Sequence, residues 1–233
     1  MLDELTSYLA RCEALIFDCD GVLVNSEEIA QQVELSTLAR MGIDFPRDEY
    51  VRRFSGTSEE EYRRLLCCDV KILHGLELTH EFFDAVDAGI HMAYSKRLAP
   101  IDGAKELVSA WGKPKAVASS SSMRTLQYKL KATGLDTVFG QHIYSADAVR
   151  AGKPDPAVFL LAAECLDIPP ARCIVIEDSV NGIVAAKRAD MTAFGFVGGG
   201  HCLSDHALQL RDVGADLVFE SHQELASLLT SGA

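Results

Sequence analysis

Long hydrophobic runs are missing from this sequence. No stretch of the 233 residues approaches the roughly 18 consecutive apolar residues that a membrane-spanning helix requires. The opening residues Met1-Leu2-Asp3-Glu4 also lack the basic and then apolar pattern of a secretory signal. We therefore expect no membrane partner and a cytoplasmic location.

Ligand pairs for a transition metal are missing as well. The seven cysteines are an odd set without a C-x-x-C pair, and the seven histidines are scattered and suggest no ligand set. This pattern predicts reduced thiols that serve mostly as small core residues. We expect neither zinc nor structural disulfides.

Basic residues are scarce. The chain has 22 Lys and Arg against 34 Asp and Glu, which gives a formal net charge of −12. Nucleic acids and anionic membranes both need a basic face, which neither half of the chain supplies, so we expect no nucleic-acid partner. An anionic small molecule would bind against this negative field only with a metal ion and a few well-placed Lys or Arg residues.

The second half of the chain alternates short apolar runs with amphipathic stretches, which is typical of parallel βαβ units. Right-handed crossovers make a doubly wound sheet the default topology for such units. The expected strands are residues 14–18, Lys115–Ser119, His142–Ser145, Cys173–Glu177, Thr192–Val197 and Leu217–Phe219.

The stretch between the first two expected strands is different, because it shows helical spacing and no strand signal. Apolar residues recur at this spacing through residues 26–41, ending at Met41, and again through residues 82–94. So long an all-helical stretch is too long for a simple crossover. The sequence therefore predicts an α/β fold: a Rossmann-like parallel sheet core, residues 1–25 and 97–233, with an all-helical domain inserted at residues 26–96.

The first expected strand ends on two carboxylates, Asp18 and Asp20, followed by Gly21. Side chains at i and i+2 of an extended segment point the same way, toward the sheet edge where open α/β folds bind ligands. Unpaired buried charge is strongly disfavoured, so a bound cation would explain the pair. An ordinary exit from strand to turn, with Asp as the turn former, is the alternative.

Two further strand ends carry polar residues that suit an anion. Ser119 and Ser120 end the second expected strand before a helix, where hydroxyl and backbone N–H groups cradle anions, although one of these serines alone would also cap the helix. Lys153 precedes another helix, at the unfavourable positive end of its dipole, unless it reaches inward to carboxylates and phosphate. A solvated surface lysine is the alternative there.

The fourth expected strand ends on Glu177 and Asp178, which repeats the pattern of the first. Asp178 would also suit a helix cap. Four carboxylates from two strands at one sheet edge, however, form an oxygen-only set of the kind that Mg²⁺ prefers.

In this order, the motifs resemble the four motifs of the haloacid dehalogenase-like superfamily, and the resemblance covers nearly the whole chain. They are D-x-D-G at Asp18, the serine Ser119, the G-K-P-D-P segment around Lys153, and the acidic pair Glu177-Asp178. The helical insert resembles the C1 cap of the β-phosphoglucomutase and phosphoglycolate phosphatase branch. Within that branch the chain is similar to bacterial sugar-phosphate phosphatases, including the 6-phosphogluconate type.

The resemblance implies a Mg²⁺-dependent phosphomonoester hydrolase acting on a small phosphorylated metabolite, such as a sugar or sugar-acid phosphate. Asp18 would be the nucleophile that forms an aspartyl phosphate, and Asp20 the general acid and base. The resemblance also implies a set of binding residues: Ser119, Ser120 and Lys153 for the phosphoryl oxygens, and Asp18, the Asp20 backbone carbonyl, Asp178 and, through a water, Glu177 for Mg²⁺.

Some positions depart from relatives of the mutase type. Ala30 stands where the mutases carry His, and Glu59 where they carry Arg, and both departures weaken a mutase assignment. A β-phosphoglucomutase-like phosphomutase is kept as the alternative, and a catalytically silent phosphate-binding module is a further one. Asn25 stands where many relatives have Asp. Arg52 and Arg53 in the insert would suit an acidic sugar phosphate, unless they form only a solvated helix face.

Overall fold

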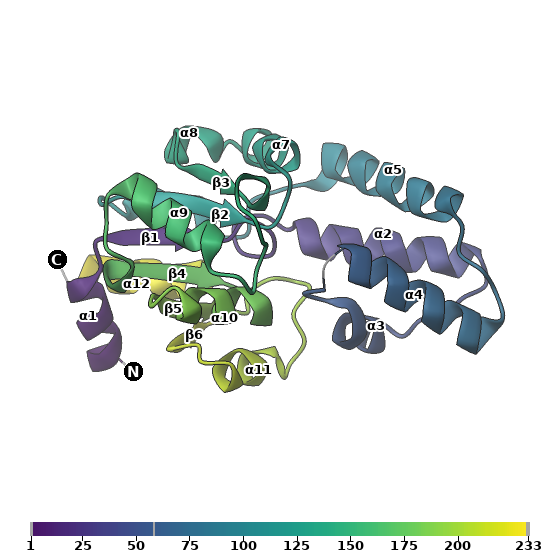
Figure 1. Cartoon of the computed structure of the whole chain (residues 1–233). Coiled ribbons are helices and arrows are strands. Elements are labelled where there is room, and N and C mark those ends of the chain that lie inside the picture. The colour runs from purple at the N-terminus through teal and green to yellow at the C-terminus, as the bar shows by residue number, and fades with distance from the viewer. Residues whose placement is uncertain (1, 58, 232–233) are drawn as a thin grey trace. The chain divides into compact units, whose positions relative to one another are not determined.

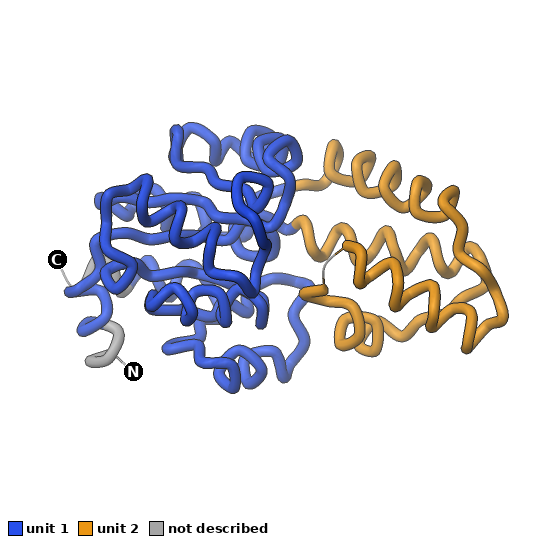
Figure 2. The backbone as a smooth tube through the Cα atoms, viewed as in Figure 1, with its two compact units in different colours: residues 1–25, 99–233 blue, residues 26–98 orange. Residues whose placement is uncertain are grey.

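The structure is a computed structural model that describes residues 2–57 and 59–231. It divides into two compact units, one of residues 1–25 and 99–233 and the other of residues 26–98 (Figure 2). The second boundary lies beyond the expected one at residues 96 and 97, because helix α5, His80–Arg97, continues through that point. Within the described ranges, no helix has both the length and the apolar character to cross a membrane.

The larger unit contains a six-stranded sheet in the order β3-β2-β1-β4-β5-β6, in which every neighbouring pair is parallel (Figure 1). This order confirms the predicted α/β fold with a doubly wound, Rossmann-like sheet. The strands are β1 Ala14–Phe17, β2 Lys115–Ser119, β3 Ile143–Ser145, β4 Cys173–Glu177, β5 Thr192–Phe196 and β6 Leu217–Phe219.

Helices pack on both faces of this sheet because its strands are apolar on both sides. On one face Ile16 of β1 belongs to a buried cluster with residues of α9, α10 and α11. On the other, the Phe17 ring packs edge-to-face on Phe139 of α8, with ring centroids 5.9 Å apart. The helices of this unit are α1 Leu2–Arg11, α6 Ala104–Ala110, α7 Met123–Thr133, α8 Asp136–Phe139, α9 Ala157–Leu166, α10 Val180–Arg188, α11 His206–Asp212 and α12 His222–Ser231, with short 3₁₀ turns at Ala146–Ala148 and Pro170–Arg172.

Asn25 has a structural role where the chain leaves and re-enters the larger unit. Its side-chain Oδ1 accepts a hydrogen bond from Ala99 N at 2.9 Å, and its backbone N donates to Ala99 O at 3.1 Å. These two bonds tie together the segments that connect to the helical unit.

The smaller unit is all-helical and has a core of its own. Its helices are α2 Ser26–Arg40, α3 Arg47–Phe54, α4 Glu59–His74 and α5 His80–Arg97. Leu38, Tyr50, Leu66 and Phe82, one from each helix, belong to the same buried cluster. Met41, which the sequence pattern assigned to the apolar face, is instead 39% exposed, because α2 ends at Arg40 and the chain turns just beyond it.

Candidate active site

The structure brings three carboxylates together where β1 and β4 end. The two strands are adjacent and parallel, with Phe17 opposite Ile176, so Asp18 comes next to Glu177. One carboxylate oxygen from each of Asp18, Glu177 and Asp178 lies within 4.8 Å of the others. The three residues are only 5%, 1% and 6% exposed, so water screens their mutual repulsion poorly.

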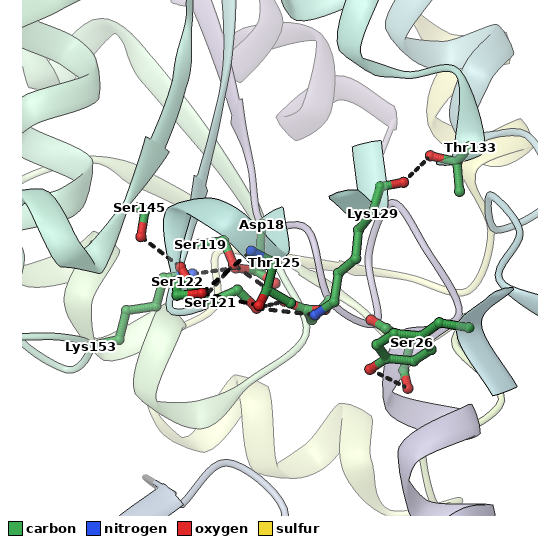
Figure 3. Close-up of polar contacts among 12 residues, drawn as sticks. Asp18, Ser26, Ser119, Ser121, Ser122, Thr125, Lys129, Thr133, Ser145 and Lys153 are labelled. Atoms are coloured by element: carbon green, nitrogen blue, oxygen red, sulfur yellow. Dashed lines mark hydrogen bonds and ion pairs between the residues drawn. The ribbon is translucent and has the colours of Figure 1, made fainter. Parts of the chain in front are cut away.

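Lys153 reaches into this acidic cluster, as Figure 3 shows for its approach to Asp18. Its Nζ lies 2.5 Å from Asp18 Oδ1 and 2.7 Å from Glu177 Oε2. Burial alone would lower the pKa of Lys153, but the two carboxylates outweigh burial and hold that pKa above its ordinary value. Lys153 is therefore a fixed ammonium group between the first and fourth strands.

The pKa of Asp18 is raised well above its ordinary value. Burial is the largest cause and the Glu177 carboxylate comes next, while Lys153 acts in the opposite direction. Three carboxylates and one ammonium group leave a net negative charge in a buried volume, which a divalent cation would neutralise. The oxygen-only donor set Asp18, Glu177 and Asp178 fits Mg²⁺.

Side chains packed around the cluster leave no room for a side chain at Gly21. A Cβ there would lie 2.0 Å from Asp178 Oδ2, and Gly21 has a φ of +76°. A glycine is therefore required for the turn after Asp20 to approach the Asp178 carboxylate.

The Asp20 carboxylate has a different set of partners. Ser119 Oγ donates to Asp20 Oδ2 at 3.2 Å and Ser121 Oγ donates to the same oxygen at 2.8 Å. On the other oxygen, Oδ1, Asp20 accepts a hydrogen bond from Lys129 Nζ. Hydrogen bonds on both oxygens fix the direction in which this carboxyl group points.

The serines that follow β2 have separate functions. Ser119 is fully buried beside Asp20, whereas Ser120 is exposed and the hydroxyl that reaches Asp20 is that of Ser121. Ser122 Oγ caps α7 by accepting from Thr125 N at 3.3 Å. The serine that caps this helix is therefore Ser122, and phosphate contacts by Ser119 and Ser120 stay predictions.

Three residues at this edge were missed by the sequence analysis. Lys129 of α7 is a buried lysine, and His201 Nε2 lies 2.7 Å from Asp178 Oδ2. His206 Nε2 lies 2.5 Å from the Asp178 backbone oxygen, and burial lowers the pKa of this imidazole. The histidines looked scattered in the sequence because no periodic pattern places the loop after β5, which carries His201, and the start of α11, which carries His206, beside Asp178.

In the helical unit, the two arginines proposed for substrate choice are both exposed. Arg53 donates two hydrogen bonds to Asp69 of α4, from Nε at 2.9 Å and from a terminal guanidinium nitrogen at 3.1 Å. Arg53 would have to break this ion pair with Asp69 before it could bind a ligand anion.

The parallel sheet and the acidic cluster at its carboxyl edge occur together in a family of hydrolases. A family model described as haloacid dehalogenase-like hydrolase matches residues 12–190, a span that includes Asp18, Ser119, Lys153 and the Glu177-Asp178 pair. The chain belongs to the haloacid dehalogenase-like hydrolase family.

Individual relatives narrow this assignment. The chain is 29% identical to the 6-phosphogluconate phosphatase of Escherichia coli, over 83% of this chain and 86% of that protein. It is 35% identical to a haloacid dehalogenase family hydrolase of Deinococcus radiodurans solved with bound phosphate and sodium, with a TM-score of 0.84 over 96% of this chain and 97% of that one. It is also 35% identical to the Arabidopsis thaliana protein SUPPRESSOR OF QUENCHING 1, chloroplastic, over 78% of this chain but only 17% of that much longer protein. These relatives place the chain in the phosphatase branch of the family.

Proposed function

We propose that this chain is a Mg²⁺-dependent phosphatase that hydrolyses a small phosphorylated metabolite through an aspartyl phosphate on Asp18. The observation that carries the proposal is the buried cluster of Asp18, Glu177 and Asp178 with Lys153 inserted into it. A nucleophilic carboxylate beside a fixed ammonium group suits attack on phosphorus, because the ammonium group offsets the charge on the phosphoryl oxygens.

In this mechanism Asp18 attacks phosphorus in line with the leaving oxygen. Asp20 gives that oxygen a proton, and in the second half of the reaction takes one from the water that hydrolyses the aspartyl phosphate. Ser119, Ser120 and Lys153 hold the phosphoryl oxygens. Asp18, the Asp20 backbone carbonyl, Glu177 and Asp178 would hold Mg²⁺, which supplies Lewis-acid stabilisation of the developing charge.

For the substrate we propose a sugar or sugar-acid phosphate, with the helical unit as the cap that selects it. The relative named 6-phosphogluconate phosphatase supports this class. Arg52 and Arg53 would pair with a carboxylate or a second anionic group of such a substrate. A sugar phosphate without a second anionic group would offer these arginines no such partner.

Release of inorganic phosphate from a panel of phosphorylated metabolites tests this function. The panel includes 6-phosphogluconate, glucose 6-phosphate, phosphoglycolate, glycerol phosphate and p-nitrophenyl phosphate, each with Mg²⁺ and with EDTA. We expect turnover with Mg²⁺ that is lost in EDTA and in Asp18→Asn. Asp212→Asn, which changes an exposed carboxylate at the end of α11, is the matched control and should behave as wild type.

Two outcomes would contradict the proposal. Conversion of a sugar phosphate into an isomer without phosphate release, dependent on a sugar bisphosphate, would indicate a mutase. Absence of turnover on the whole panel, with phosphate still binding in the presence of Mg²⁺, would indicate a silent binding module.

A further inference from the structure

Lys129 is a buried lysine that the mechanism above does not use. It lies on α7 with its side chain 5% exposed, and its Nζ contacts Asp20 Oδ1. The same Nζ donates to Ser121 Oγ at 3.0 Å (Figure 3). Ser121 Oγ in turn donates to Asp20 Oδ2 at 2.8 Å. Lys129, Ser121 and Asp20 therefore form a closed ring of hydrogen bonds in the larger unit.

A buried ammonium group is costly unless a charged partner compensates it, so its position needs an explanation. The helix that carries Lys129 is well fixed: Ser122 caps its first turn, and Thr133 Oγ1 donates to the Lys129 backbone oxygen at 2.8 Å. Leu126 and Leu130 on the same helix are fully buried. The lysine is thus a rigid anchor, and its ammonium group is compensated by the carboxylate of Asp20.

We propose that Lys129 is a positioning residue that holds the Asp20 carboxyl group in place for proton transfer. The proposal rests on the proposed function, in which Asp20 is the general acid and base. Ser119 also bonds Asp20, but in that mechanism its hydroxyl turns to the phosphoryl group. Lys129 and Ser121 then remain to fix the two oxygens of Asp20.

The proton balance of the reaction leaves Lys129 unchanged throughout. In the first half, the bond from phosphorus to the ester oxygen breaks, the bond from phosphorus to Asp18 forms, and the Asp20 proton goes to the leaving oxygen. In the second half, Asp20 takes a proton from water, whose oxygen bonds phosphorus as the Asp18 bond breaks. Lys129 affects the reaction only by holding the Asp20 carboxyl group in position.

A leaving-group comparison separates this role from a general structural one. An alkoxide needs the proton from Asp20 to leave, whereas p-nitrophenolate leaves without it, and kcat/KM reports the half-reaction in which the leaving group departs. For Lys129→Met we expect kcat/KM to fall about 10- to 100-fold on the best alkyl phosphate of the panel, because misplacing a catalytic group by about 1 Å costs on that order. On p-nitrophenyl phosphate, kcat/KM should stay close to the wild-type value.

Lys131→Met is the matched control, since it removes an exposed lysine from the same helix and should leave both kcat/KM values unchanged. A double-mutant cycle gives the second test. In an Asp20→Asn background, adding Lys129→Met should lower kcat/KM for the alkyl phosphate no further, because the group that Lys129 positions is already inactive.

Several results would overturn the proposal. They are an equal loss on both substrates, an increase in kcat/KM, and an undiminished loss in the Asp20→Asn background. Lys129→Gln, which keeps a hydrogen-bond donor, is the second variant and should lose less activity. If neither Lys129 variant unfolds cooperatively on heating, the lysine is needed for folding and the proposal is wrong. A wild type that hydrolyses neither ester would instead refute the proposed function.

Discussion

Replacing Asp18 with Asn should stabilise the protein without Mg²⁺ while abolishing turnover. The carboxylate of Asp18 is buried beside Glu177 and Asp178, and its raised pKa means that the folded state disfavours its ionised form. An asparagine has nearly the same shape and keeps an oxygen that can accept from Lys153. Glu177 continues to pair with Lys153 at 2.7 Å, so that ammonium group is not left without a carboxylate.

The size of this stabilisation follows from the balance of charges in the cluster. The substitution removes one negative charge from a set of three that has one ammonium group within bonding distance. Single stabilising substitutions commonly add about 0.5–2 kcal/mol to the free energy of unfolding, and we expect the removal of this charge to fall in that range. For a chain of this length each kcal/mol shifts Tm by about 2–4 °C, so we expect an increase of about 1–8 °C.

Thermal unfolding in EDTA and in increasing Mg²⁺ measures this effect. Wild type should gain stability with Mg²⁺ by mass action, whereas Asp18→Asn should start higher and gain less because one ligand carries no charge. Asp212→Asn, the exposed control, should follow wild type in both buffers. A lower Tm for Asp18→Asn in EDTA, or an equal response of both proteins to Mg²⁺, would refute the argument from crowded carboxylates.

Three other changes test neighbouring parts of the structure. Gly21→Ala should lower the free energy of unfolding by about 1–3 kcal/mol, seen in urea unfolding, and abolish turnover, because its Cβ would meet Asp178 and the backbone has a φ of +76°. Lys153→Met leaves two buried carboxylates without their ammonium partner, so the free energy of unfolding in EDTA should fall by about 3–5 kcal/mol, seen as a lower Tm. Added Mg²⁺ should recover part of this loss of stability. Burial lowers the pKa of His222, so as pH falls the imidazole takes up a proton in the unfolded chain before it does so in the folded protein. The free energy of unfolding should therefore decline below about pH 6.5, by up to about 1.4 kcal/mol per pH unit. His222→Phe should reduce that slope.

The sequence was sufficient for the sheet and for the strand ends that carry the acidic cluster. Asp18 and Glu177 each follow an apolar run, and a strand fixes the direction of its residues with a period of two. Parallel pairing then brings the ends of such runs to one edge, and the structure has Asp18 and Glu177 there. Local pattern and topology agree, which is why this part was predictable.

Lys129 was not found because its signal is weak at the level of sequence. It lies three residues after Leu126 and four before Thr133, so helical spacing alone puts it on the buried face of α7. A lysine at such a position usually extends its charged end to water, and the sequence analysis did not pursue it. Only the fold shows that Asp20, more than a hundred residues away along the chain, lies at the end of its side chain.

Two buried lysines offset part of the electrostatic difficulty of an acidic chain that would bind an anion, and a divalent cation would offset more of it. The net charge of −12 repels a phosphate at long range, but solvent and salt screen that field beyond about 10 Å. Within that distance Lys153 pairs with the carboxylates of Asp18 and Glu177, while Lys129 pairs with that of Asp20. The proposed nucleophile and the proposed acid and base thus have separate ammonium partners on different segments. The same sheet edge can therefore hold two aspartates two residues apart and give each a different function.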